Sequence, residues 1–170
     1  MRKNEFWAVY LLLLLAQLLL SNYFNISPYL MVTILPVMVL CIPIRVGPAP
    51  AMLIAFATGL VVDLLSEGLL GLNALALVPV AGLRFPLIRL MFGEELFARK
   101  EDFCPRRHGL GKAAAATFLA LAVFILIYVW ADGAGTRPFW FCAARWAASL
   151  AASLLLSLAC LPNLAPDTRK

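Results

Sequence analysis

The sequence predicts an all-α, polytopic integral membrane protein: residues 1–170 form one transmembrane domain, a bundle of about six helices. Hydrophobic residues make up 64% of the chain and charged residues 14%, and the mean hydropathy is +0.93. Soluble globular proteins are about half apolar and about a quarter charged. A water-soluble fold could not bury this much apolar surface, so a bilayer must solvate it. Helices are expected because unpaired strand edges are too costly in lipid, and no alternating barrel pattern is present.

Six apolar segments are separated by polar, proline or glycine breaks. The expected spans are residues 5–20, 28–44, 50–66, 71–92, 112–131 and 139–161, with a polar loop at 93–111. No small-x-small cleavage site follows the first apolar run, so that run is expected to stay as a helix. Pro36 should kink the second span. The second and third spans are the shortest, which leaves a tilted or partly re-entrant path open there.

The basic residues predict the orientation of the bundle. With six spans both termini lie on one side, and most Lys and Arg residues fall there, whereas the opposite side has only Arg137. The positive-inside rule therefore places both termini and loop 93–111 in the cytoplasm. The basic residues are scattered between apolar runs and form no continuous stripe, so nucleic acid is not an expected partner.

Loop 93–111 is a candidate docking surface for a cytoplasmic protein. Its basic pairs are Arg99 with Lys100 and Arg106 with Arg107. The alternative is a solvated connection that touches anionic lipid head groups. Cys104 and His108 are too few for a structural zinc site, which needs four ligands. We expect no metal, no other cofactor and no catalytic residue, because no acid–base pair or metal cluster stands near an interface.

Polar residues inside the apolar segments are the more informative candidates, because a charge in hydrocarbon costs about 2.5–3.5 kcal/mol or more. They are Asp63, Asn73, Arg84 and Arg145. Asp63 and Arg145 lie at similar expected depths near the outer side. We expect them to pair or to share a polar pocket with Asn73. The alternative is that each side chain reaches the outer head groups separately, and Arg84 lies deeper, nearer the cytoplasmic side.

The last span contains small residues at a spacing of four, namely Ala144, Ala148 and Ala152, with serines at 149, 153 and 157. Such spacing lets helices approach closely in lipid. The face formed by the alanines either packs inside the bundle or receives a transmembrane helix of a partner.

Residues 56–89 carry a family-like pattern. It comprises a Gly-Leu pair, an Asp three residues later, a glycine-containing break and a Gly-x-x-Ala start of the next helix: Gly59, Leu60, Asp63, Gly68, Gly71 and Ala74. In this pattern the chain resembles the rod shape-determining protein MreD family. Residues 27–29 and 97–103 and the early Arg145 resemble its Bacteroidetes-like branch.

The resemblance implies a non-enzymatic membrane scaffold of the cell-elongation (rod) complex in the bacterial inner membrane. The expected partner is an MreC-like protein with one membrane span and a periplasmic domain. MreB filaments and the wall-building glycosyltransferase and transpeptidase are further partners, in the service of lateral peptidoglycan synthesis and cell shape. The fold implied resembles the substrate-binding subunits of energy-coupling-factor transporters. The alternative function is therefore a small-molecule-binding subunit of such a transporter, although the first span offers only Ala8 and Ala16 as small residues.

Overall fold

The computed structural model describes residues 3–23, 30–67, 70–93, 110–133 and 137–164, and these residues are helical apart from short connections and residues 30–34. The helices are α1 (Lys3–Tyr23), α2 (Leu35–Leu40), α3 (Pro48–Val62), α4 (Leu72–Phe92), α7 (Leu110–Gly133) and α8 (Phe139–Leu164). A π-helical turn, η1 (Asp63–Glu67), continues α3. Within the described ranges, five stretches are long and apolar enough to cross a membrane. The expectation of a helical membrane protein is thus confirmed.

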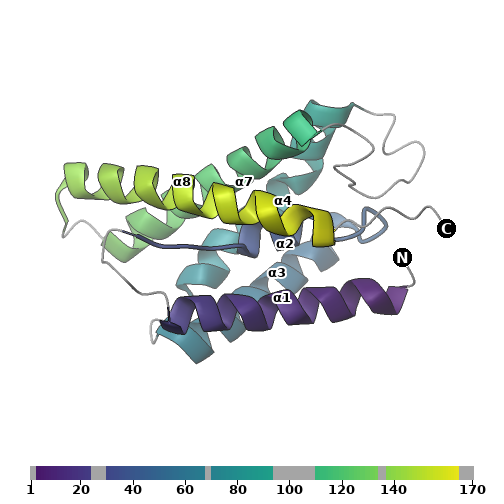
Figure 1. Cartoon of the computed structure of the whole chain (residues 1–170), viewed down its shortest axis with the longest axis horizontal. Coiled ribbons are helices and arrows are strands. Elements are labelled where there is room, and N and C mark those ends of the chain that lie inside the picture. The colour runs from purple at the N-terminus through teal and green to yellow at the C-terminus, as the bar shows by residue number, and fades with distance from the viewer. Residues whose placement is uncertain (1–2, 24–29, 68–69, 94–109, 134–136, 165–170) are drawn as a thin grey trace.

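The long helices form one bundle, in which α1 and α8 run along its length while α3, α4 and α7 cross it obliquely (Figure 1). Helices α3, α4, α7 and α8 pack against one another in chain order, while α1 lies against η1, α3, α2 and α8. Every residue of the short α2 is buried, so α2 lies at the centre of the core. Helix α1 begins and α8 ends at the same end of the bundle (Figure 1).

The outer surface of the bundle is apolar. Leu11, Leu12, Leu15 and Leu19 on α1 have 59–65% of their surface exposed. Water would make such a leucine face costly, whereas lipid tails solvate it at no penalty. The structure therefore supports a multi-pass membrane protein.

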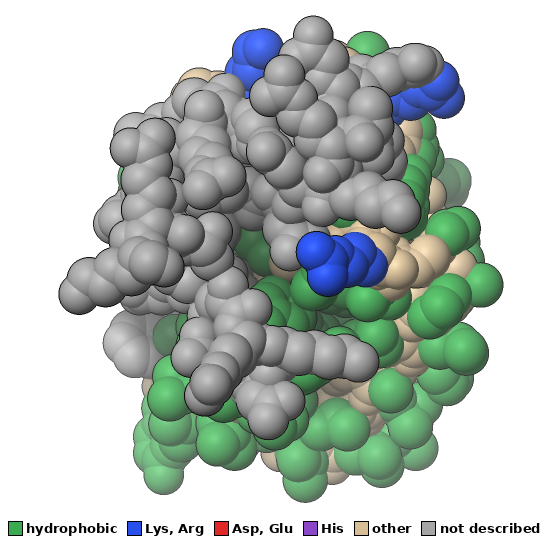
Figure 2. Space-filling model, turned by 90° about the vertical axis from the view of Figure 1, so that its right-hand side faces the viewer, with side chains coloured by type: hydrophobic (Ala, Val, Ile, Leu, Met, Phe, Trp, Pro, Cys, Tyr) green, Lys and Arg blue, Asp and Glu red, His purple; other side chains and the backbone are tan. Residues whose placement is uncertain are grey.

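The two ends of the bundle differ in chemistry. Exposed aromatic residues gather at the end where α1 and α7 finish and α8 begins: Tyr23, Trp130, Phe139 and Trp140. Exposed Arg45, Arg89 and Lys112 belong to the opposite end, and Figure 2 looks onto that end, where Lys and Arg side chains stand out. Aromatic belts and basic residues both mark membrane–water interfaces.

The expected helical span 28–44, kinked at Pro36, is wrong over residues 30–34. Residues 30–34 form a non-helical segment that ends at Ile34, the N-cap of α2 (φ −111°, ψ −1°), and α2 begins only at Leu35 with Pro36 in its first turn. Pro36 lacks an amide hydrogen and would clash with the carbonyl four residues earlier, so it starts a helix instead of kinking one. Figure 1 shows the extended segment running lengthwise between α1 and α8, back towards the end where α3 begins. We call residues 30–42 the broken crossing.

Candidate functional site

The family-like residues meet at the turn between α3 and α4. Asp63 is fully buried at the start of η1, and its carboxylate accepts four hydrogen bonds. Its Oδ2 accepts from the amides of Gly71 at 3.0 Å and Ala74 at 3.2 Å. Its Oδ1 accepts from both the amide and the side-chain Nδ2 of Asn73, each at 3.0 Å. The carboxylate therefore caps the N-terminus of α4, where free amides and the helix dipole favour negative charge.

Two glycines make this cap possible. A Cβ on Gly59 would lie 2.5 Å from Ala74 Cα and 2.5 Å from Ala74 N, so only glycine lets α3 approach the start of α4. Gly71 has φ of +99°, a left-handed conformation that other residues rarely adopt. Leu60 is half-buried beside them, whereas Gly68 lies outside the described residues. The sequence pattern thus corresponds to one closed structural unit, with the Asp63 oxygens occupied by protein donors.

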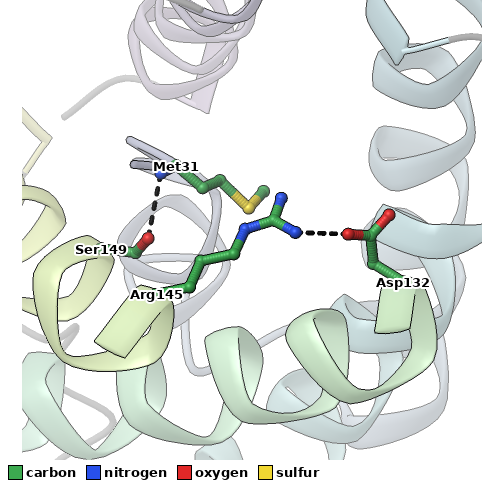
Figure 3. Close-up of polar contacts among 4 residues, drawn as sticks. All are labelled: Met31, Asp132, Arg145 and Ser149. Atoms are coloured by element: carbon green, nitrogen blue, oxygen red, sulfur yellow. Dashed lines mark hydrogen bonds and ion pairs between the residues drawn. The ribbon is translucent and has the colours of Figure 1, made fainter. Parts of the chain in front are cut away.

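Arg145 does not pair with Asp63, and that prediction is wrong. Its Nη1 donates to Oδ2 of Asp132, in the last turn of α7, in a largely buried ion pair (Figure 3). Asp132 and Arg145 flank the connection between α7 and α8, so their partnership is local. Asn73 does join Asp63, so half of the expected polar pocket is present. Asp132 was missed, although its position at a helix end, thirteen residues before Arg145, was a signal that could have identified it.

Arg84 is fully buried and holds the end of the broken crossing, residues 40–42. Its Nε donates to Leu40 O at 3.3 Å, and its Nη2 donates to Ile42 O. These carbonyls stand at the C-terminal end of α2, where helix carbonyls lack intrahelical partners and favour a cation. The guanidinium also lies 5.3 Å from the centre of the Phe85 ring. The buried Arg84 side chain thus supplies donors to backbone carbonyls of the broken crossing. Contact with lipid head groups does not explain its position.

The beginning of the broken crossing, residues 30–34, is held by side chains in place of neighbouring strands. On one side, Met31 N donates to Ser149 Oγ at 2.9 Å and Thr33 N donates to Ser153 Oγ at 3.0 Å (Figure 3 shows the first). Ser153 Oγ also donates to Met31 O at 3.2 Å. Both serines belong to α8, and both contacts reach the extended segment 30–34.

On the other side of the same segment stands Gln17 of α1. Ile34 N donates to its Oε1 at 2.8 Å, and its Nε2 lies 3.5 Å from Val32 O. Alternate residues of an extended backbone direct their polar groups to opposite sides. Residues 31 and 33 therefore face α8, while 32 and 34 face α1. Unpaired backbone groups are very costly in a membrane interior, which explains why these polar side chains surround the segment.

The sequence reading missed Gln17 and the role of the serines. A glutamine within a leucine run and a proline within a short apolar segment were the available signals. Neither signal identifies the backbone groups that the side chains contact, because these contacts join residues from 15 to 122 positions apart.

The alanines of α8 occupy the side of the helix away from the serines. Ala144 and Ala148 are exposed and Ala152 is half-buried, whereas Ser149, Ser153 and Ser157 are fully buried. Ala147 and Ala151 are exposed as well. We call Ala144, Ala147, Ala148, Ala151 and Ala152 the alanine face. The alanine face therefore does not mainly serve packing inside this chain, whereas the serines do.

The four basic docking candidates Arg99, Lys100, Arg106 and Arg107 lie outside the described residues, as do Cys104 and His108. In the part of the chain that the structure describes, no group of three or more His, Cys, Asp or Glu residues is arranged to hold a metal ion.

Comparison of this chain with models of known protein families, with curated proteins and with solved structures finds no match.

Proposed function

We propose that this chain is a non-enzymatic membrane scaffold that binds the single transmembrane helix of a partner protein on the alanine face of α8. The observation that carries the proposal is the exposure of Ala144, Ala147, Ala148 and Ala151 on one side of a helix at the edge of the bundle. Between membrane helices, small residues allow close backbone approach, which drives association where the hydrophobic effect cannot.

The pattern from Gly59 to Ala74 gives the proposal its biological setting. The chain resembles MreD in this pattern, so the partner helix is that of an MreC-like protein, within a rod complex that directs lateral peptidoglycan synthesis and cell shape. Loop 93–111 would then meet MreB filaments, and the wall-building glycosyltransferase and transpeptidase would join the assembly. No nucleic acid, metal or other cofactor takes part in this role.

The transporter alternative receives less support from the geometry. Such a subunit would meet its coupling protein through small residues on the first helix. Here α1 presents exposed leucines, and Ala8 and Ala16 stand eight residues apart among them. In addition, the amides of Met31, Thr33 and Ile34 in the broken crossing donate to protein side chains. They are therefore not available to bind a small molecule.

We expect the double substitution Ala148→Leu with Ala152→Leu to reduce capture of the partner at least about tenfold, because two leucines hold the helices apart and remove their close contact. The measurement is co-purification of an MreC-like protein from detergent-solubilised native membranes. Ala57→Leu on the exposed side of α3 is the matched control and should leave capture unchanged. Unchanged capture by the double variant would remove α8 as the contact face. A small metabolite that co-purifies in stoichiometric amount would favour the transporter function.

The proposed location is the bacterial inner membrane, with six passes of which the broken crossing is the second, and with both termini in the cytoplasm. The exposed Arg45, Arg89 and Lys112 at the end of the bundle where α1 begins support this orientation. We expect a fluorescent protein fused after Lys170 to fluoresce and alkaline phosphatase fused there to be inactive. An active phosphatase would reverse the orientation, and the same pair of reporters after Arg137 should give the opposite result.

A further inference from the structure

Helix α8 has an internal four-residue repeat. From residue 148 to 159 it reads Ala-Ser-Leu-Ala, Ala-Ser-Leu-Leu and Leu-Ser-Leu-Ala. Ser149 and Ser153 contact the extended segment, and Ser157 is fully buried on the same side of the helix. Leu150, Leu154 and Leu158 pack on the hydrophobic core. A shift of the helix by four residues therefore presents nearly the same surface to its neighbours.

The spacing of the serines matches the spacing of the backbone groups that they contact. Four helical residues rise about 6 Å, and two extended residues advance about 6.6 Å. The pairs run in the same chain direction, Ser149 with Met31 and then Ser153 with Thr33. The two elements therefore form a ladder whose rungs are about one helical turn apart.

Ser157 continues the ladder by one more rung, but this rung is empty. The residue is fully buried, and its Oγ has no hydrogen-bond partner among the residues that the structure describes. A buried hydroxyl without a partner is unfavourable, because it has lost its hydrogen bonds to water without replacement. Ser157 stands four residues beyond Ser153, at the position that would come level with Thr33 if α8 moved by one turn.

We propose that α8 has two hydrogen-bonded registers against the broken crossing and slides between them by one turn. In the second register α8 moves about 6 Å towards the end of the bundle where it begins, and rotates by about 40°. Ser153 then accepts from Met31 N and Ser157 accepts from Thr33 N. Leu154 and Leu158 take the places of Leu150 and Leu154, so these two apolar contacts are retained. Leu150 takes the place of Trp146, and the hydrogen bond from Trp146 Nε1 to Ala122 O is made only in the present register.

The Asp132–Arg145 ion pair holds the register seen here. Arg145 precedes Ser149 by four residues, so the slide displaces it by about 6 Å along the axis of α8 relative to Asp132 and rotates it by about 40°, which removes the present geometry of the ion pair. Its long side chain can follow the aqueous boundary. One-turn slides of a packed helix are an established type of two-state change. The slide moves the alanine face along the bundle without any change within α8 itself, and it does not depend on the identity of a partner.

The test is a distance measured by pulsed electron paramagnetic resonance in lipid nanodiscs. Spin labels on a genetically encoded ketone side chain replace the exposed Leu12 of α1 and Trp140 of α8, which leaves the native cysteines untouched. These sites lie at different depths, so the slide lengthens the distance between them by about 4–6 Å.

Two conservative variants should shift the registers in opposite directions. Ser149→Ala removes a bond made only in the present register and should raise the share of the longer distance. Ser157→Ala removes the spare rung and should lower it. Each shift should change the ratio of the two distances by about two- to tenfold, the factor carried by one hydrogen bond. Asp132→Asn combined with Ser149→Ala should make the longer distance dominant.

Ser66→Ala is the matched control, because Ser66 donates to Val62 O within its own turn and is not part of the ladder. It should leave the ratio unchanged. One unchanged distance in all variants would overturn the proposal, as would shifts of Ser149→Ala and Ser157→Ala in the same direction.

Discussion

Gly59→Ala should greatly reduce the amount of folded protein in the membrane and destabilise the remainder by about 3 kcal/mol or more. The added methyl group would lie 2.5 Å from the Cα and N atoms of Ala74 and 2.8 Å from the carbonyl carbon of Asn73. These are backbone atoms of the first turn of α4, which the Asp63 carboxylate holds in place. Because they cannot move aside singly, the whole contact between α3 and α4 must open, and overpacking of this kind is costly.

The measurement is the midpoint of thermal unfolding in detergent, together with the yield of monodisperse protein from membranes. Gly82→Ala is a demanding control, because Gly82 also lies within a helix and its new methyl group would also meet a neighbour, the Met52 methyl. That neighbour is the end of a flexible side chain and can rotate away. Both substitutions gain about the same helix propensity. Equal stability of the two variants would refute the role assigned to Gly59.

The second large effect is expected for Asp63, where both Asp63→Ala and Asp63→Asn should cost at least about 3 kcal/mol. Alanine leaves the buried amides of Gly71, Asn73 and Ala74 without an acceptor, and each orphaned group costs about 1–3 kcal/mol. Asparagine has nearly the same shape, but its NH₂ group would face donors at one of the two carboxylate positions. The two variants should therefore be similarly unstable, which a role in packing alone would not produce.

The free energy of unfolding by SDS titration measures this effect and also tests the corrected pairing. Asp63→Ala and Arg145→Ala should be additive in a double-mutant cycle, because the two side chains share no partner. Asp132→Ala and Arg145→Ala should be non-additive, because each removes the same ion pair. Coupling between Asp63 and Arg145, with none between Asp132 and Arg145, would contradict the arrangement described here.

Composition and the polar, proline and glycine breaks between apolar runs were enough to predict a helical membrane protein and the approximate positions of the five long helices. The reason is that a long apolar run has one solution in lipid, a helix that satisfies its own backbone. The cluster from Gly59 to Ala74 was also recognisable, since its members stand within sixteen residues of one another and act through the turn between two successive helices. A helix end and a turn are formed by residues close in the sequence, so their pattern can be recognised in the sequence alone.

The broken crossing and the buried polar contacts depended on tertiary structure. In residues 28–44, hydropathy is equally compatible with a helix and with an extended segment, provided that other elements supply donors and acceptors. Here Gln17, Ser149 and Ser153 do so from helices distant in the chain, and Arg84 caps the end of α2. Likewise Arg145 pairs with Asp132 and not with Asp63. The expected depth of a residue in the membrane does not determine which helices are neighbours. Hydrogen bonding is short-ranged, so its partners are decided only when the bundle has packed.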